Sequence, residues 1–104
     1  MSDIKDLQSR ALEIRHKYSE LEKSKYGRGW TNEELVLGLV GDIGDLTKLV
    51  VAKEGMRETV DLDNKLAHEI SDCLWSLLVL AAQYDIDVET VFLKTMDELE
   101  ARLA

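Results

Sequence analysis

The sequence predicts an all-α fold in which four helices form a bundle or a close relative of one. Apolar residues recur at steps of three and four residues in four successive segments, which is the spacing of amphipathic helices. The 104 residues include six glycines and no proline, whereas an all-β chain of this size would carry turn residues at short, regular intervals. Short connections between the segments favour antiparallel neighbours. We therefore expect a single domain over residues 1–104.

The first helix is predicted over residues 3–25. Its apolar and aromatic positions share one face, opposite a charged face: Ile4, Leu7, Ala11, Leu12, Ile14, Tyr18 and Leu21. The segment that follows carries Gly27 and Gly29, which permit backbone angles that other residues resist. The helix should end there.

The second helix is predicted from Thr31 to Lys53 or Glu54. Thr31 and Glu34 have the spacing of a capping box, and Gly55 stands where a left-handed residue often ends a helix. The expected apolar stripe consists of Leu35, Leu39, Val40, Ile43, Leu46, Leu49 and Val50.

The third helix should begin at a cap provided by Asp61 or Asp63 and run to about Tyr84. Residues 73–82 contain one polar side chain, Ser76, so we expect this part of the helix to be buried on all sides. Three other helices of one small chain cover it poorly, which predicts a homodimer or homotetramer. Cys73, the only cysteine, is expected to pack in the core.

The fourth helix should begin at a cap formed by Asp87. Its expected inner face consists of Val88, Val91, Phe92, Met96, Leu99 and Leu103.

Charge and hydropathy argue against nucleic-acid binding and against association with a membrane. Asp and Glu outnumber Lys and Arg by 21 to 13, a formal charge of −8. This balance disfavours nucleic-acid binding, which depends on Lys and Arg that neutralise phosphates. Met1 is not followed by an apolar signal segment, and no apolar stretch approaches the roughly 20 residues that span a bilayer. We expect a cytoplasmic protein with no membrane partner.

Two carboxylate pairs are the residues best suited to chemistry. Asp42 and Asp45 lie three apart in the second helix, and Glu69 and Asp72 lie three apart in the third, so the members of each pair point the same way. If these helices pack antiparallel, the pairs can face one another and offer the oxygen ligands that suit Mg²⁺ or Mn²⁺. With 21 acids in the chain, such pairs also arise by chance on a solvated face.

The same residues resemble a known family. Glu69-Ile-Ser-Asp72-Cys-Leu-Trp resembles the ExxD helix of the MazG-like all-α nucleotide pyrophosphohydrolases, and Gly41-Asp42-Ile-Gly-Asp45-Leu resembles their preceding EExxE helix. The resemblance extends from Trp30 to Ala104. It implies that Asp42, Asp45, Glu69 and Asp72 bind Mg²⁺, with Mn²⁺ as a substitute. It also implies hydrolysis of nucleoside triphosphates between the α and β phosphates, which gives a monophosphate and pyrophosphate.

The chain departs from the family pattern at its first acid. Gly41 stands where the family usually has Glu, and the next two acids, Asp42 and Asp45, are each one methylene shorter. The last helix also lacks an Asn that family members often carry. These departures support an alternative, in which a MazG-like module has lost catalysis and binds nucleotides or acts as a helical interaction protein.

Further residues are candidates for binding the substrate. We expect Lys48, Lys53, Arg57 and Lys65 to contact phosphate oxygens, or else to be solvated surface side chains. Trp30 could stack on a base or pack against the start of the second helix. Glu69 is the expected general base toward the attacking water. His16 and His68 are expected to be ordinary surface or boundary residues.

Overall fold

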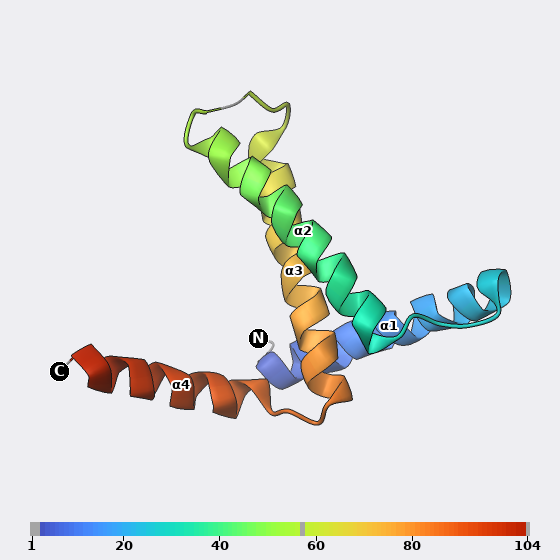
Figure 1. Cartoon of the computed structure of the whole chain (residues 1–104). Helices are drawn as coiled ribbons and strands as arrows, with labels where there is room; N and C mark the ends of the chain where they lie inside the picture. Colours follow the sequence, from blue (N-terminus) through green and yellow to red (C-terminus); the bar gives the residue numbers. More distant parts are fainter. Residues whose placement is uncertain (1–2, 57, 104) are drawn as a thin grey trace. The chain divides into compact units, whose positions relative to one another are not determined.

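The computed structural model describes residues 3–56 and 58–103, and within them the chain forms four α-helices and no strand (Figure 1). The helices are α1 (Ile4–Tyr26), α2 (Asn32–Lys53), α3 (Leu62–Gln83) and α4 (Val88–Leu103). This confirms the all-α class and places each helix within one or two residues of its predicted bounds. None of the described helices is both long enough and apolar enough to cross a membrane.

The helices group into two compact units. The first unit comprises the chain up to Gly29 together with Leu78 and the residues after it, and the second unit comprises Trp30–Leu77. α1 and α4 therefore belong to the first unit, α2 belongs to the second, and α3 contributes residues to both. A single domain and a bundle of all four helices stay predictions.

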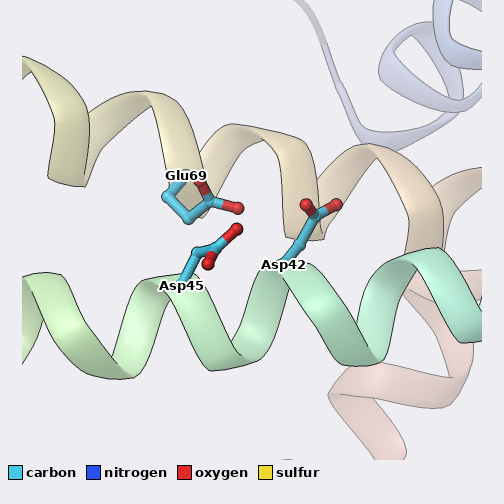
Figure 2. Close-up of side chains that lie close together, drawn as sticks. All are labelled: Asp42, Asp45 and Glu69. Carbon is cyan, nitrogen blue, oxygen red and sulfur yellow. The ribbon is translucent and has the colours of Figure 1, made fainter.

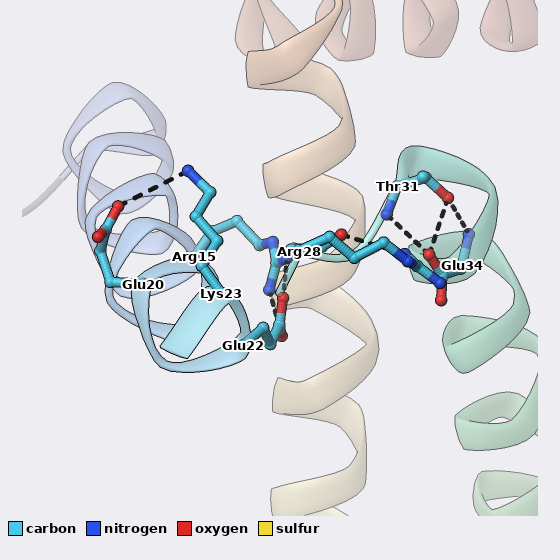
Figure 3. A network of polar contacts seen from close by, with 8 residues as sticks. Arg15, Glu20, Glu22, Lys23, Arg28, Thr31 and Glu34 are labelled. Atoms are coloured by element: carbon cyan, nitrogen blue, oxygen red, sulfur yellow. Dashed lines mark hydrogen bonds and ion pairs between the residues drawn. The ribbon is translucent and has the colours of Figure 1, made fainter. Parts of the chain in front are cut away.

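In the first unit, local polar contacts define α1. The backbone N–H of Asp6 donates to the side chain of Asp3 at 2.9 Å, and Gly27 ends the helix in the left-handed conformation, with φ of 80°. Arg15 and Glu22 form a bidentate ion pair, with distances of 2.7 Å from Nη2 to Oε1 and 3.1 Å from Nη1 to Oε2 (Figure 3). Both side chains are largely shielded from solvent, at 7% and 13% exposure, so the pair is a buried contact within α1.

In the second unit, capping contacts fix both ends of α2. The predicted capping box is present, because the Glu34 N–H donates to the Thr31 hydroxyl at 3.2 Å and the Thr31 N–H donates to Glu34 at 3.2 Å (Figure 3). Gly55 follows the helix with φ of 86°, as predicted. Asp61, which also adopts a positive φ, of 56°, directly precedes α3.

The two helices of the second unit run side by side in opposite directions (Figure 1). Leu35, Leu39 and Ala52 are the buried residues of α2, and Leu46 and Leu49 are half-buried on the same face. The other predicted stripe residues of α2, Val40, Ile43 and Val50, are exposed. The apolar face of α2 is therefore wider than the surface that α3 covers.

Burial within one chain is less complete than predicted for α3 and α4. In α3, Cys73, Ser76, Leu78, Val79 and Ala81 are buried, as expected. Leu74 and Leu77 are 46% and 53% exposed, because within the second unit a single neighbouring helix covers a single face of α3. α4 has no buried residue, and all but Val88 of its expected inner face are exposed.

Candidate metal centre

Carboxylates occupy core-facing positions on both helices of the second unit. Asp42 follows the buried Leu39 by three residues, and Glu69 precedes the buried Cys73 by four, so each acid continues the inward-facing row of its helix. Both acids are half-buried. An acid at such a position is desolvated and is costly to keep ionised unless a cation or a hydrogen bond compensates.

Three carboxylates converge between α2 and α3. Asp42, Asp45 and Glu69 each offer one oxygen, and these atoms all lie within 4.8 Å of one another. Figure 2 shows the side chains pointing from the two helices into the space between them. The structure thus brings together three of the four acids that were predicted as metal ligands. We call this group the acidic cluster.

Burial and neighbouring negative charges both disfavour the ionised form of the Glu69 carboxyl. Its Oε1 is buried and has no hydrogen-bond partner in the part of the chain described. Burial raises the pKa of the Glu69 carboxyl, and the charges of Asp42, Asp72 and Asp45 raise the pKa further. Glu69 therefore has a buried oxygen without a hydrogen-bond donor, and three neighbouring carboxylates repel its charge. These surroundings suit a hard cation such as Mg²⁺ or Mn²⁺, which takes oxygen ligands.

The neighbouring thiol does not extend this donor set. Cys73 is buried, as predicted, and burial raises the pKa of its thiol, with further increases from Asp42, Glu69 and Asp72. The thiol is therefore protonated at neutral pH, and only a thiolate is a good metal ligand.

Asp72, the fourth predicted ligand, is not a member of the acidic cluster. Its Oδ2 lies 3.2 Å from Nε2 of His68, one helical turn earlier, and its side chain is 44% exposed. Asp72 is still close enough for its charge to raise the pKa of Glu69. Its role as a metal ligand stays a prediction.

The predicted phosphate-binding residues have different surroundings. Lys48 and Lys65 line a pocket of about 500 Å³ in the second unit, which also includes Asp45 and Glu69. Lys53 is instead held by Asp63, with an Nζ···Oδ1 distance of 2.6 Å, and this contact ties the end of α2 to the start of α3. Arg57 lies outside the described residues.

Trp30 packs against α2, as one of its two predicted roles required. A Cβ added at Gly38 would lie 3.3 Å from Cζ3 of the Trp30 ring, so the ring occupies the space that this glycine leaves open. Gly38 precedes Asp42 by four residues and shares its helix face. Trp30 is 50% exposed, which leaves part of the ring accessible about one turn from the acidic cluster.

The pocket also contains four polar residues that the sequence analysis did not assign to a site: Thr59, Asp61, Asn64 and His68. His68 is exposed, as expected for a surface residue, and it also lines the pocket and contacts Asp72. His68 precedes Asp72 by four residues, a spacing that predicts contact between the two side chains on one face of a helix. Thr59 and Asn64 carried no comparable signal, because their positions depend on how the connection between the helices folds.

A model of the MazG nucleotide pyrophosphohydrolase domain matches residues 30–103 of the chain. The matched range contains the acidic cluster and leaves α1 outside. No curated protein and no solved structure matches the chain.

Proposed function

The chain belongs to the MazG nucleotide pyrophosphohydrolase domain family, and on that premise we propose that it hydrolyses nucleoside triphosphates between the α and β phosphates, with Mg²⁺ as its cofactor. The products would be a nucleoside monophosphate and pyrophosphate. The observation that carries the proposal is the acidic cluster, in which a buried oxygen of Glu69 faces carboxylates from a second helix.

Asp42, Asp45 and Glu69 would hold the metal, and Asp72 would join them once its carboxylate leaves His68. When bound, Mg²⁺ supplies positive charge that offsets the charge on the phosphate oxygens during in-line attack by water. Glu69 has a further role in this proposal, as the base that receives the proton of the attacking water.

Contacts to the rest of the substrate would come from the same unit. Lys48 and Lys65 bring positive charge to the pocket beside the acidic cluster, which suits an anionic phosphate chain. The accessible part of Trp30 offers a face on which any base can stack.

We also propose that the active form is a homodimer or homotetramer. Apolar side chains are exposed in rows on both helices of the second unit: Val36, Val40 and Ile43 on α2, and Ile70, Leu74 and Leu77 on α3. Contiguous exposed apolar surface of this kind is typical of an interface. Light scattering should report a multiple of the 11.8 kDa chain mass at micromolar concentration, and a stable monomer would refute this part.

A product assay tests the reaction. A panel of nucleoside triphosphates is incubated with the protein and Mg²⁺, and we expect monophosphate and pyrophosphate in equal amounts. Glu69→Gln should abolish turnover, while Glu20→Gln, which removes a charge from α1 outside the matched region, should retain it. Orthophosphate as the only product would contradict the proposed bond cleavage. Nucleotide binding without turnover would favour the module that has lost catalysis.

A further inference from the structure

The apolar face of α4 is uncovered along most of the helix. Every residue from Thr90 to Leu103 is exposed. The exposed side chains include large apolar ones at steps of four, three and four residues, which is the spacing of the seam between two paired helices: Phe92, Met96, Leu99 and Leu103. Because most of the stability of a helix in a protein comes from packing of its apolar face, α4 needs a surface that covers it.

The α1 helix of the same chain does not provide this surface. α1 and α4 contact each other within the first unit, where Nε2 of Gln8 donates to the Ile86 carbonyl at 3.3 Å, just before α4 begins. From this contact the two helices diverge (Figure 1). Along its diverging part α1 exposes apolar side chains of its own, those of Tyr18 and Leu21. The surface that covers α4 must therefore belong to another molecule.

Net charge distinguishes the surfaces that a second copy of the chain offers. Counted as Lys and Arg against Asp and Glu, α1 has six basic and four acidic side chains and a net charge of +2. Among the other described helices, α2 has two basic and four acidic side chains, α3 has one and three, and α4 has two and four, so each carries −2. Like charges oppose contact of α4 with a second α4 or with the exposed rows of α2 and α3. The basic helix α1 of a second copy attracts it.

The apolar residues of α1 have the same spacing as those of α4. Both helices carry apolar side chains at steps of four and then three residues: Ile14, Tyr18 and Leu21 on α1, and Phe92, Met96 and Leu99 on α4. Equivalent positions differ by 78 in residue number (92 − 14), and so do Gln8 and Ile86 (86 − 8), which are in contact within one chain. A two-fold axis through that contact therefore places α4 of one copy parallel to α1 of the other, with the apolar residues in register.

Charges beside the seam agree with this register. Lys17 stands just before Tyr18 on α1, and Glu100 stands just after Leu99 on α4. In a parallel pair of helices, residues at these flanking positions form ion pairs across the seam. Lys17 is exposed and lies 3.7 Å from Glu13 in its own helix, so its ammonium group is accessible to the partner's Glu100.

We propose that two copies of the chain exchange α4 across a two-fold axis, so that the apolar face of each α4 lies parallel along α1 of the other copy. Tyr18 then faces the partner's Met96, and Leu21 faces the partner's Leu99. This contact goes beyond the proposed function, because it involves neither the acidic cluster nor the exposed rows of α2 and α3. Its α1 surface lies outside the region that the family model matches.

Cysteine cross-linking of the full chain tests the register. In a Cys73→Ala background, a chain with Leu21→Cys and Leu99→Cys should form a covalent dimer of twice the 11.8 kDa chain mass on mild oxidation. Leu21→Cys with Phe92→Cys is the matched control, because Phe92 lies seven residues, about 10.5 Å along the helix, from Leu99. The control should cross-link about tenfold more slowly, since a disulfide needs Cα atoms about 4.4–6.8 Å apart.

Three results would overturn the proposal. A disulfide within one chain would mean that α4 folds onto its own α1. Equal rates for the two cysteine pairs would mean that the helices meet without a fixed register. A chain that is fully helical by circular dichroism and forms no covalent dimer would mean that the two helices do not meet.

Charge reversal tests the parallel arrangement. In the chain with Leu21→Cys and Leu99→Cys, Lys17→Glu should slow dimer cross-linking about threefold, because it turns attraction into repulsion in both symmetric contacts. Adding Glu100→Lys should restore the rate. Lys94→Glu, the same change on the opposite face of α4, should leave the rate within about twofold. A rate that Lys17→Glu does not change, or that Glu100→Lys does not restore, would overturn the parallel arrangement.

These outcomes are separable from those of the proposed function. Hydrolysis of nucleoside triphosphates by a chain that does not cross-link would leave the reaction standing and remove the exchange of α4. Cross-linking in register without hydrolysis would do the reverse.

Discussion

Asp45 of α2 and Glu69 of α3, 24 positions apart in the sequence (69 − 45), direct carboxylate oxygens to within 4.8 Å of each other (Figure 2). Two carboxylates at this separation repel, and Asp42 adds a third charge to the same space. The arrangement opposes folding when no cation is bound, which is typical of a site shaped for binding rather than for stability.

Removing one of these charges should stabilise the metal-free protein. We expect Asp45→Asn to increase the free energy of unfolding in EDTA at pH 7 by on the order of 1 kcal/mol, the interaction of unit charges about 4 Å apart in water. Thermal unfolding followed by circular dichroism measures the change. Added Mg²⁺ should raise the melting temperature of the parent chain and have little effect on the variant. Destabilisation of the metal-free variant would instead give Asp45 a structural role.

The pH dependence of stability should reveal the raised pKa of the Glu69 carboxyl. Its pKa is raised in the folded state, so its contribution favours folding below the ordinary glutamate pKa and is lost as pH rises through the raised value. Without metal, Glu69→Gln should therefore be more stable than the parent chain at pH 7, and the difference should disappear toward pH 4. Urea unfolding at a series of pH values measures this, and a pH-independent difference would argue against a perturbed Glu69.

The affinity of the acidic cluster for a metal ion should depend on the protonation of Glu69. Protons compete with the cation for Glu69, so the affinity for Mn²⁺ should begin to fall at a pH above the ordinary glutamate value. Titration calorimetry from pH 7.5 down to pH 5 measures the trend. An affinity that stays constant across this range would show that Glu69 is not a ligand.

The ion pair between Arg15 and Glu22 should be important for the stability of the first unit. Glu22→Ala leaves a guanidinium that is 7% exposed without its carboxylate, and we expect a loss of about 3 kcal/mol. The double variant Arg15→Met, Glu22→Leu should recover much of this loss, because it removes both charges and keeps apolar volume. Denaturant unfolding of the parent chain, the single variant and the double variant measures these changes in the free energy of unfolding. Equal losses in the single and double variants would mean that packing, rather than the unpaired charge, is responsible.

The capping box of α2 provides a test of local structure close to the site. Thr31→Ala removes the hydroxyl that accepts from Glu34, and we expect a loss of about 1 kcal/mol. Thr47→Ala is the matched control, since the Thr47 hydroxyl contacts only a helix carbonyl within the described chain and alanine is the better helix former. Equal effects of the two substitutions on unfolding would contradict the capping role.

The helices were predictable because their ends carry local signals. Thr31 with Glu34 begins α2, Gly27 ends α1, and Asp87 accepts from the Thr90 N–H at 3.3 Å as the predicted cap of α4. Each contact spans at most four residues, so the sequence alone contains the partners. Burial was predicted less well. Whether an apolar face such as that of α4 is buried depends on which neighbouring helices or other copies of the chain cover it, and periodicity does not specify this.

The acidic cluster was predictable for a related reason. Residues three apart on one helix share a face, and a short connection makes the next helix antiparallel, so Asp42, Asp45 and Glu69 could be expected to meet. The spacing could not show that Asp72 contacts His68 or that Lys53 contacts Asp63. These contacts depend on side-chain rotamers and on the path of a connection, which periodicity does not specify.

The most direct test of the central claim is the location of Mn²⁺ by anomalous scattering in a crystal of the full chain soaked with the ion. We predict a peak between α2 and α3, within coordination distance of carboxylate oxygens of Asp42, Asp45 and Glu69, and its absence from a Glu69→Gln crystal. Mn²⁺ bound elsewhere, with these three carboxylates in contact only with water, would contradict the account.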